Sequence, residues 1–238
     1  MELSDLPLPG DTVGLIEGLT STRSIRRYTD EPVPPEALRT MLFAATRAPS
    51  GSNRQPFRFV VLTDGPVARE AKALIGDAAR QAWGSKRTRD GYDTGSGTDA
   101  TSRKARMAAT MQAYVDEFER VPVLILPCLI RYRGPAPTEG ASVYPACQNL
   151  LLAARALGFG GVLTIWHALV EPQLHELLHI PDDVFIAATM TLGRPAGANG
   201  PVRRRPLPEL VFEERWDEPA PWAVDPPGTE HTSVRRSE

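Results

Sequence analysis

The chain has 238 residues, of which 42% are hydrophobic and 24% are charged, and its formal net charge is −2. A chain of this length can bury a sizeable core in one large domain. Because its charge is close to neutral, the totals exclude bulk electrostatic attraction to nucleic acid or to a membrane surface, and any anion site requires local clusters of basic residues.

The first half of the chain alternates helical and strand-like patterns. Apolar spacing predicts helices over 11–19, over 34–45 with a pair of prolines in the first turn, over 67–83 and over 104–119, with a strand at 57–62. Residues 84–102 are rich in Gly, Ser, Thr and charge and have almost no apolar side chains. We therefore expect this segment to be an exposed loop or a mobile lid.

The second half continues with strands at 121–130, 161–166 and 184–192 and helices at 141–157 and 171–178. Helix 141–157 is apolar nearly all round, which indicates burial in the core or against another chain. Helices and strands do not alternate regularly, and this favours an α+β fold over a doubly wound sheet.

The two ends of the chain and its cysteines predict a cytoplasmic protein. No basic, apolar leader pattern begins the chain, and the longest apolar run, 121–130, is too short to span a bilayer. Cys128 and Cys147 have neither CxxC nor metal-ligand spacing and are expected to be reduced and buried. After 212 the sequence is rich in proline, so we expect one domain over 11–212 and a tail over 213–238 that is either disordered or anchored by its tryptophans.

Two arginine clusters are the strongest candidates for an anion site. Arg23, Arg26 and Arg27 lie near the start with Ser24 beside them, and a run of three arginines spans 203–205. Arginine presents a planar fork of donors that suits a phosphate. A solvated charged surface is the alternative interpretation of either cluster.

The loop over 49–56 is dense in small residues and amides, which let a flat ligand approach the backbone. It could equally be an ordinary polar connection from a helix to a strand. The glycines at 158–161 precede a strand rather than follow one, so they do not match a dinucleotide fingerprint. No metal-ligand, nucleophile or paired-carboxylate motif stands out, which is typical of an enzyme whose cofactor performs the chemistry.

Three segments together resemble the nitroreductase family. Residues 22–28 (TRSIRRY) are similar to its R-S-x-R-x-[FY] element, and 48–57 (APSGSNRQPF) to its A-P-S-x-x-N-x-Q-P-[WF] element. Residues 156–164 are similar to its L-G-x-G turn into a strand. Order and spacing fit over roughly residues 15–212, and the arginine run resembles the C-terminal phosphate segment of the family.

This resemblance implies an intertwined homodimer with a mixed, mostly antiparallel central sheet flanked by helices and with FMN at the subunit interface. The residues expected at the cofactor are Arg23, Ser24 and Arg26 from one subunit, Pro49, Ser50, Gly51, Ser52 and Asn53 from the other, Leu163, Thr164 and Ile165 along the ring system, with Trp166 and His167 nearby, and Arg203, Arg204 and Arg205 at the phosphate. The single sequence does not tell which of the last three point inward.

The implied activity is hydride transfer from NADH or NADPH through FMN to a nitroaromatic, quinone or similar small acceptor, in a ping-pong mechanism. A cation such as Arg26 would stabilise the negative charge of the reduced flavin, and no catalytic side chain or metal is required. Flavin cleavage or reductive dehalogenation on the same fold, and a non-catalytic protein that stores or senses flavin, remain as alternatives.

Overall fold

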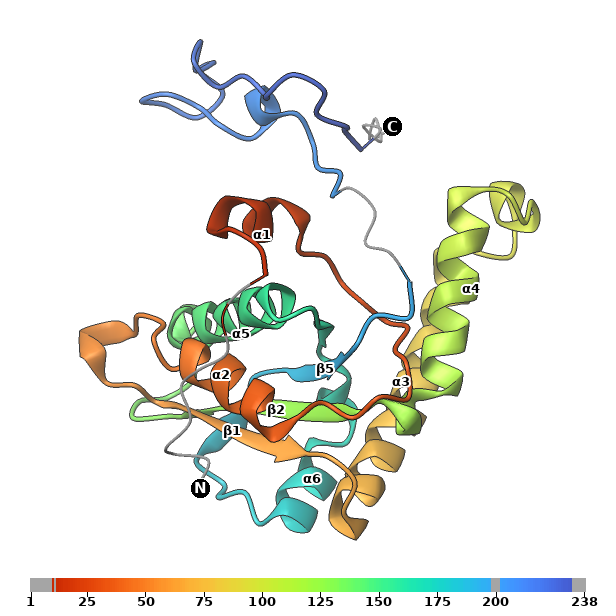
Figure 1. Ribbon diagram of the computed structural model, residues 1–238, viewed down its shortest axis with the longest axis vertical. Coiled ribbons are helices and arrows are strands. Elements are labelled where there is room, and N and C mark those ends of the chain that lie inside the picture. Colours follow the sequence, from red (N-terminus) through yellow and green to blue (C-terminus); the bar gives the residue numbers. More distant parts are fainter. Residues whose placement is uncertain (1–9, 11, 198–201, 233–238) are drawn as a thin grey trace. The chain divides into compact units, whose positions relative to one another are not determined.

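The computed structural model describes residues 10, 12–197 and 202–232, and the chain divides into two compact units, 1–198 and 199–238. The first unit contains the helices α1 (Leu15–Ser21), α2 (Pro35–Ala45), α3 (Pro66–Arg89), α4 (Arg103–Asp116), α5 (Tyr144–Ala156) and α6 (Glu171–Leu178), and the strands β1 (Phe57–Leu62), β2 (Val123–Ile130), β3 (Gly160–Thr164), β4 (Val184–Ile186) and β5 (Thr189–Gly193) (Figure 1).

The strands form one sheet in the order β1-β2-β5-β3, with β4 also paired to β2, and each of these pairs is antiparallel. The single strand predicted over 184–192 is therefore two strands. The break lies opposite Pro127 of β2, which has no N–H to donate to a ladder. There, Ala187 N donates to the Pro127 carbonyl over 2.8 Å. The prediction of an α+β fold with a mostly antiparallel sheet between helices is confirmed.

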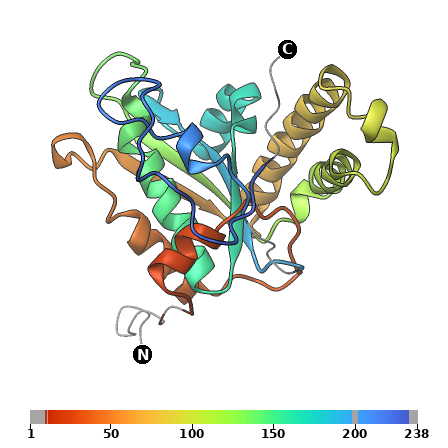
Figure 2. The ribbon, with the colours of Figure 1, turned by 90° about the horizontal axis from the view of Figure 1, so that it is seen from above.

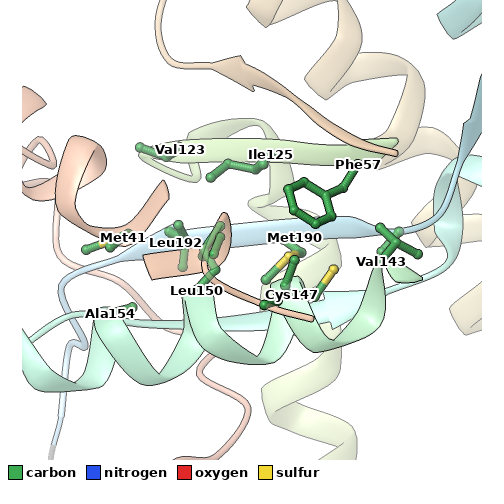
Figure 3. Packing of buried hydrophobic residues seen from close by; sticks show 14 of the residues in the cluster. Met41, Phe57, Val123, Ile125, Val143, Cys147, Leu150, Ala154, Met190 and Leu192 are labelled. Carbon is green, nitrogen blue, oxygen red and sulfur yellow. The ribbon is translucent and has the colours of Figure 1, made fainter. Parts of the chain in front are cut away.

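Alternation along β2 builds a core on each face of the sheet. Val123 and Ile125 belong to a cluster that includes side chains of α2, α5 and β5, whereas Leu124 and Leu126 belong to one that includes α3, α4 and α6. Figure 3 shows the first cluster between the sheet and α5. Helix α5 packs against α2 and against the sheet, including strand β3. These contacts account for its apolar composition.

Helix α3 continues six residues beyond the end predicted at 83, and Figure 2 shows it beside α4 (yellow). Local contacts stabilise the last turns of α3, where apolar side chains are scarce. Trp83 packs on Tyr92 with ring centroids 5.1 Å apart, and Arg87 forms an ion pair with Asp93 at 2.6 Å. The chain between the two helices is largely exposed, and its role as a lid stays a prediction.

The second unit is built of turns around a few apolar contacts. Phe212 packs on Trp216 with ring centroids 5.1 Å apart, and Trp222 Nε1 donates to Glu213 over 3.0 Å. The predicted FMN-binding domain over 11–212 reaches into this unit, and its extent stays a proposal.

Cys128 and Cys147 are free and buried, as predicted. Burial raises the pKa of the Cys128 thiol to about 11 and that of Cys147 to about 12. None of the described helices combines the length and apolar character needed to cross a bilayer. Within the described part of the chain, no three His, Cys, Asp or Glu side chains gather closely enough to hold a metal ion.

Candidate functional site

Segment 22–28, which contains the first arginine cluster, lies along β3, the last strand in the sheet order. Ile25 N donates to the Gly161 carbonyl over 2.9 Å, and Thr29 N donates to the Arg194 carbonyl over 2.9 Å. A Cβ on Gly160 would lie 2.5 Å from Cγ1 of Ile25, so the absence of a side chain permits this close approach. The structure thus brings the predicted segments 22–28 and 163–165 to one edge of the sheet.

Arg26 is half-buried, while Arg23 and Ser24 are exposed. The Arg26 Nε is buried and has no hydrogen-bond partner among the described residues. Burial is the main cause that lowers the pKa of Arg26, and the nearby Arg23 cation acts in the same direction. Arginine nevertheless stays protonated in proteins. Since an unpaired buried donor costs about 1–3 kcal/mol, this nitrogen marks a position where a ligand acceptor would be stabilising.

This segment is supported by buried Tyr114, half-buried Tyr28 and buried Thr191, which the sequence analysis missed. Thr191 Oγ1 lies 2.8 Å from Tyr28 Oη and 2.7 Å from Tyr114 Oη, and Tyr28 Oη donates to the Ile25 carbonyl over 2.7 Å. Burial raises the pKa of both tyrosines. Two threonines in the strand predicted over 184–192 were the available signal, because a buried hydroxyl requires a partner.

The turn after β3 exposes one predicted residue and anchors the next two. Leu163 and Thr164 are half-buried, whereas Ile165 is 65% exposed. Trp166 packs on the ring of Tyr114 at 5.5 Å between centroids. His167 is buried and its backbone N donates to Thr189 Oγ1 over 3.2 Å.

His167 also lies with its Nδ1 3.1 Å from Thr189 Oγ1. Burial lowers the pKa of this imidazole. Thr189 and Thr191 of β5 point to the same side of the sheet, because residues two apart on a strand share a face. Thr189 contacts the turn after β3 through His167, and Thr191 contacts the segment with Arg26 through Tyr28.

The predicted loop over 49–56 has a strained backbone. Ser52, Asn53 and Gln55 have φ values of 52°, 51° and 50°, a region that L-residues rarely adopt. Ser50 Oγ accepts a hydrogen bond from Gln55 N over 2.9 Å, and Gly51 N donates to Ser142 Oγ over 3.2 Å. Strain of this kind in an exposed loop is frequent at ligand sites.

Four of the residues predicted at the cofactor in the first unit line two different cavities. Arg26 lines one of about 480 Å³ beside α4, together with Tyr28 and Tyr114. Pro49, Ser50 and Gly51 line another of about 490 Å³ together with residues that follow β2. Neither of these two cavities is lined by residues of both groups, and the expectation that the groups act from different subunits stays a prediction.

The second unit holds the predicted phosphate residues 203–205. Arg203 forms an ion pair with Glu230, and Arg205 forms one with Glu209 at 2.8 Å. Arg204 has no carboxylate partner among the described residues, and its Nη1 donates to the Arg203 carbonyl over 2.9 Å. Arg204 is thus the member of the run whose guanidinium is least engaged with acidic groups.

Comparisons with known proteins assign the first unit to one family. The family model described as Nitroreductase family matches residues 19–194. NADH dehydrogenase of Thermus thermophilus is 30% identical over 223 residues, covering 80% of this chain and 91% of the relative.

Two solved structures are also similar to this chain. A Desulfovibrio desulfuricans protein described as a nitroreductase in complex with FMN is 30% identical, with a TM-score of 0.61 over 86% of this chain and 99% of that one. NADPH:FMN oxidoreductase of Vibrio harveyi, complexed with NAD+, is 25% identical, with a TM-score of 0.60 over 85% of this chain and 78% of that one. The protein is of the α+β class with an antiparallel sheet between helices. It belongs to the nitroreductase family.

Proposed function

We propose that this protein is an FMN-dependent oxidoreductase that takes hydride from NADH or NADPH and passes it to a small acceptor. The observation that carries the proposal is Arg26, a half-buried cation whose Nε has no partner among the described residues, in the segment that lies along the edge strand β3. Family membership over residues 19–194 supports the same conclusion, as do the FMN and NAD+ named in the two solved relatives.

The residues at this edge fit a flavin. Arg26 would supply the charge that stabilises an anionic ring edge, and Arg23 and Ser24 would add exposed donors. Main-chain groups at 163–165 would lie along the ring system. The strained loop 49–53 would close the site from the partner subunit of a homodimer. When bound, the flavin supplies the hydride chemistry, so these residues bind and orient rather than act as acids or bases.

Arg204 is our choice for the phosphate contact within the run 203–205. Arg203 and Arg205 already have carboxylate partners, so recruiting either of them would require breaking an ion pair. Arg204 has no such partner within the described part of the second unit and can donate two parallel hydrogen bonds.

The acceptors that we propose are nitroaromatics, quinones or similar flat molecules. Exposed Ile165 at the turn after β3 offers an apolar surface beside the proposed cofactor. If the hydride donor and the acceptor occupy the same face in turn, the kinetics will be ping-pong. The proposed setting is the cytoplasm, with no nucleic acid or membrane partner.

An absorption experiment tests the proposal. Purified protein is mixed with FMN, freed of excess cofactor and treated anaerobically with NADH or NADPH. We expect retained FMN, rapid bleaching and recovery of the yellow colour when an acceptor is added. Retained flavin that bleaches only slowly would instead support a storage or sensing role. A protein that rejects FMN would refute the proposal.

A further inference from the structure

The cavity beside the strained loop has a wall that the proposed cofactor site does not use. It is lined by Pro49, Ser50 and Gly51 on one side and by the end of β2 and residues 131–142 on the other. The two sides are joined by the hydrogen bond from Gly51 N to Ser142 Oγ. An occupant of this cavity would therefore lie next to the loop that we propose to contact the flavin.

The charges at this wall do not cancel. Arg131 and Glu139 neutralise each other through two hydrogen bonds of 2.6 and 2.9 Å, with 27% and 22% of their side chains exposed. Arg133 and Arg54 have no carboxylate partner among the described residues. Both instead lie over the ring of Tyr132, with their guanidinium carbons 5.4 and 4.3 Å from its centroid.

This arrangement is suited to an anion. The Tyr132 ring gathers two guanidinium groups at one place, and cation–π contacts of this kind leave the N–H donors at the edge of each guanidinium available. The cavity also offers apolar surface from Leu129, Ile130 and Pro56. A ligand with a flat apolar body and a carboxylate or phosphate group matches both features.

We infer that the cavity between the 49–51 loop and residues 131–142 binds the anionic group of a substrate through Arg133, which lines it, and Arg54, which lies over the ring of the lining residue Tyr132. The inference rests on the proposed function, because it places this ligand beside the proposed cofactor. A carboxylate on an aromatic acceptor and a phosphate of the nicotinamide nucleotide share the required chemistry, and the experiment below distinguishes them.

The test compares anionic with neutral ligands in FMN-loaded wild-type protein and in the double variant Arg54→Gln/Arg133→Gln. The acceptors are 4-nitrobenzoate and the neutral 4-nitrobenzyl alcohol with NADH as donor, and a second arm compares NADPH with NADH on the neutral acceptor. Arg47→Gln is the matched control, since Arg47 also lies over an aromatic ring, that of Phe43 at 4.7 Å, but neither Arg47 nor Phe43 lines the cavity.

If the anion is the acceptor carboxylate, the double variant lowers the ratio of kcat/KM for 4-nitrobenzoate to that for the alcohol by about tenfold, the effect of one lost charge-assisted contact. If the anion is the phosphate that NADPH has and NADH lacks, the ratio of kcat/KM for NADPH to that for NADH falls instead. Arg47→Gln leaves both ratios at the wild-type values. Unchanged ratios in the double variant would overturn the inference.

Calorimetric titration with benzoate, compared with benzyl alcohol, gives a readout that does not need turnover. We expect benzoate to bind the FMN-loaded protein more tightly than the alcohol and to lose this preference in the double variant. A wild-type protein that retains FMN and prefers benzoate but turns over no acceptor would contradict the proposed function while supporting the anion site. A protein that reduces the neutral acceptor but shows no preference for anions in either assay would support the proposed function and contradict the anion site.

Discussion

Tyr114 and Thr191 lie 77 residues apart in the chain, yet their hydroxyl oxygens are 2.7 Å apart in the interior. Tyr28 Oη reaches the same threonine over 2.8 Å and also donates to the Ile25 carbonyl. One side chain of β5 therefore links α4 to the segment that presents Arg26. We regard Thr191 as a positioning residue for that arginine.

Replacing Thr191 with valine preserves the shape of the side chain and removes its hydroxyl. Tyr114 Oη then loses its partner, whereas Tyr28 Oη keeps the backbone carbonyls of Ile25 and of residue 191. We expect the free energy of unfolding to fall by about 1–3 kcal/mol, as for other unsatisfied buried groups. Urea unfolding measures this loss.

Thr191→Ser is the matched control, because it retains the hydroxyl. The serine variant should keep wild-type FMN affinity, whereas the valine variant should bind FMN more weakly at temperatures where both are folded. Equal stability and equal affinity in the two variants would show that the hydroxyl does not position Arg26.

The double variant Arg23→Ala/Arg26→Ala tests the proposed donors at the flavin. Loss of these charge-assisted contacts should weaken FMN binding by at least about tenfold, measured from the quenching of flavin fluorescence. Arg27→Ala is the control, because Arg27 is an exposed arginine of the same segment that we have not assigned to the flavin. If all these variants bind FMN like the wild type, the assignment of the segment is wrong.

Single alanine substitutions across 203–205 test the choice of Arg204. We expect Arg204→Ala to weaken FMN binding by about tenfold, because its guanidinium is the one not engaged with a carboxylate in the described unit. Arg203→Ala and Arg205→Ala should have smaller effects, since they mainly remove exposed ion pairs worth about 0–1 kcal/mol. Fluorescence titration with FMN makes the comparison, and three equal losses would contradict the ranking.

The buried thiols predict a dependence of stability on alkaline pH. Burial raises the pKa of Cys128 from 9.0 to about 11 and that of Cys147 from 9.0 to about 12. As the pH rises above about 9, the unfolded chain loses these protons before the folded chain does. The contribution of the thiols to the free energy of unfolding should therefore be fully present below pH 9. It should be lost as the pH rises toward 11 and 12.

Urea unfolding at pH 8 and pH 10 measures this fall, with Cys128→Ala/Cys147→Ala as the comparison. The double variant should lose stability less steeply between the two pH values than the wild type. Tyr28 and Tyr114 are unchanged in it, and their raised pKa values contribute equally to both proteins. The same pH dependence in both proteins would mean that the thiols do not contribute.

Local periodicity was sufficient for most elements of the fold. The alternation along β2 and the apolar character of α5 can be read from neighbouring residues, because helices and strands repeat their pattern over a few positions. The end of α3 at Arg89 and the break between β4 and β5 were not predicted. The first depends on contacts of Tyr92 and Asp93 with α3, and the second depends on Pro127 in another strand.

By itself, the sequence determined the kind of fold and the candidate segments at 22–28, 49–53 and 163–165, because the order of these motifs along the chain is enough to suggest the family. The tertiary structure alone decided which groups meet. Thr191 contacts two tyrosines, Arg203 contacts Glu230, and the 49–51 loop lies against residues 131–142. These contacts join residues far apart in sequence, and their formation depends on the path of the folded backbone rather than on any local pattern.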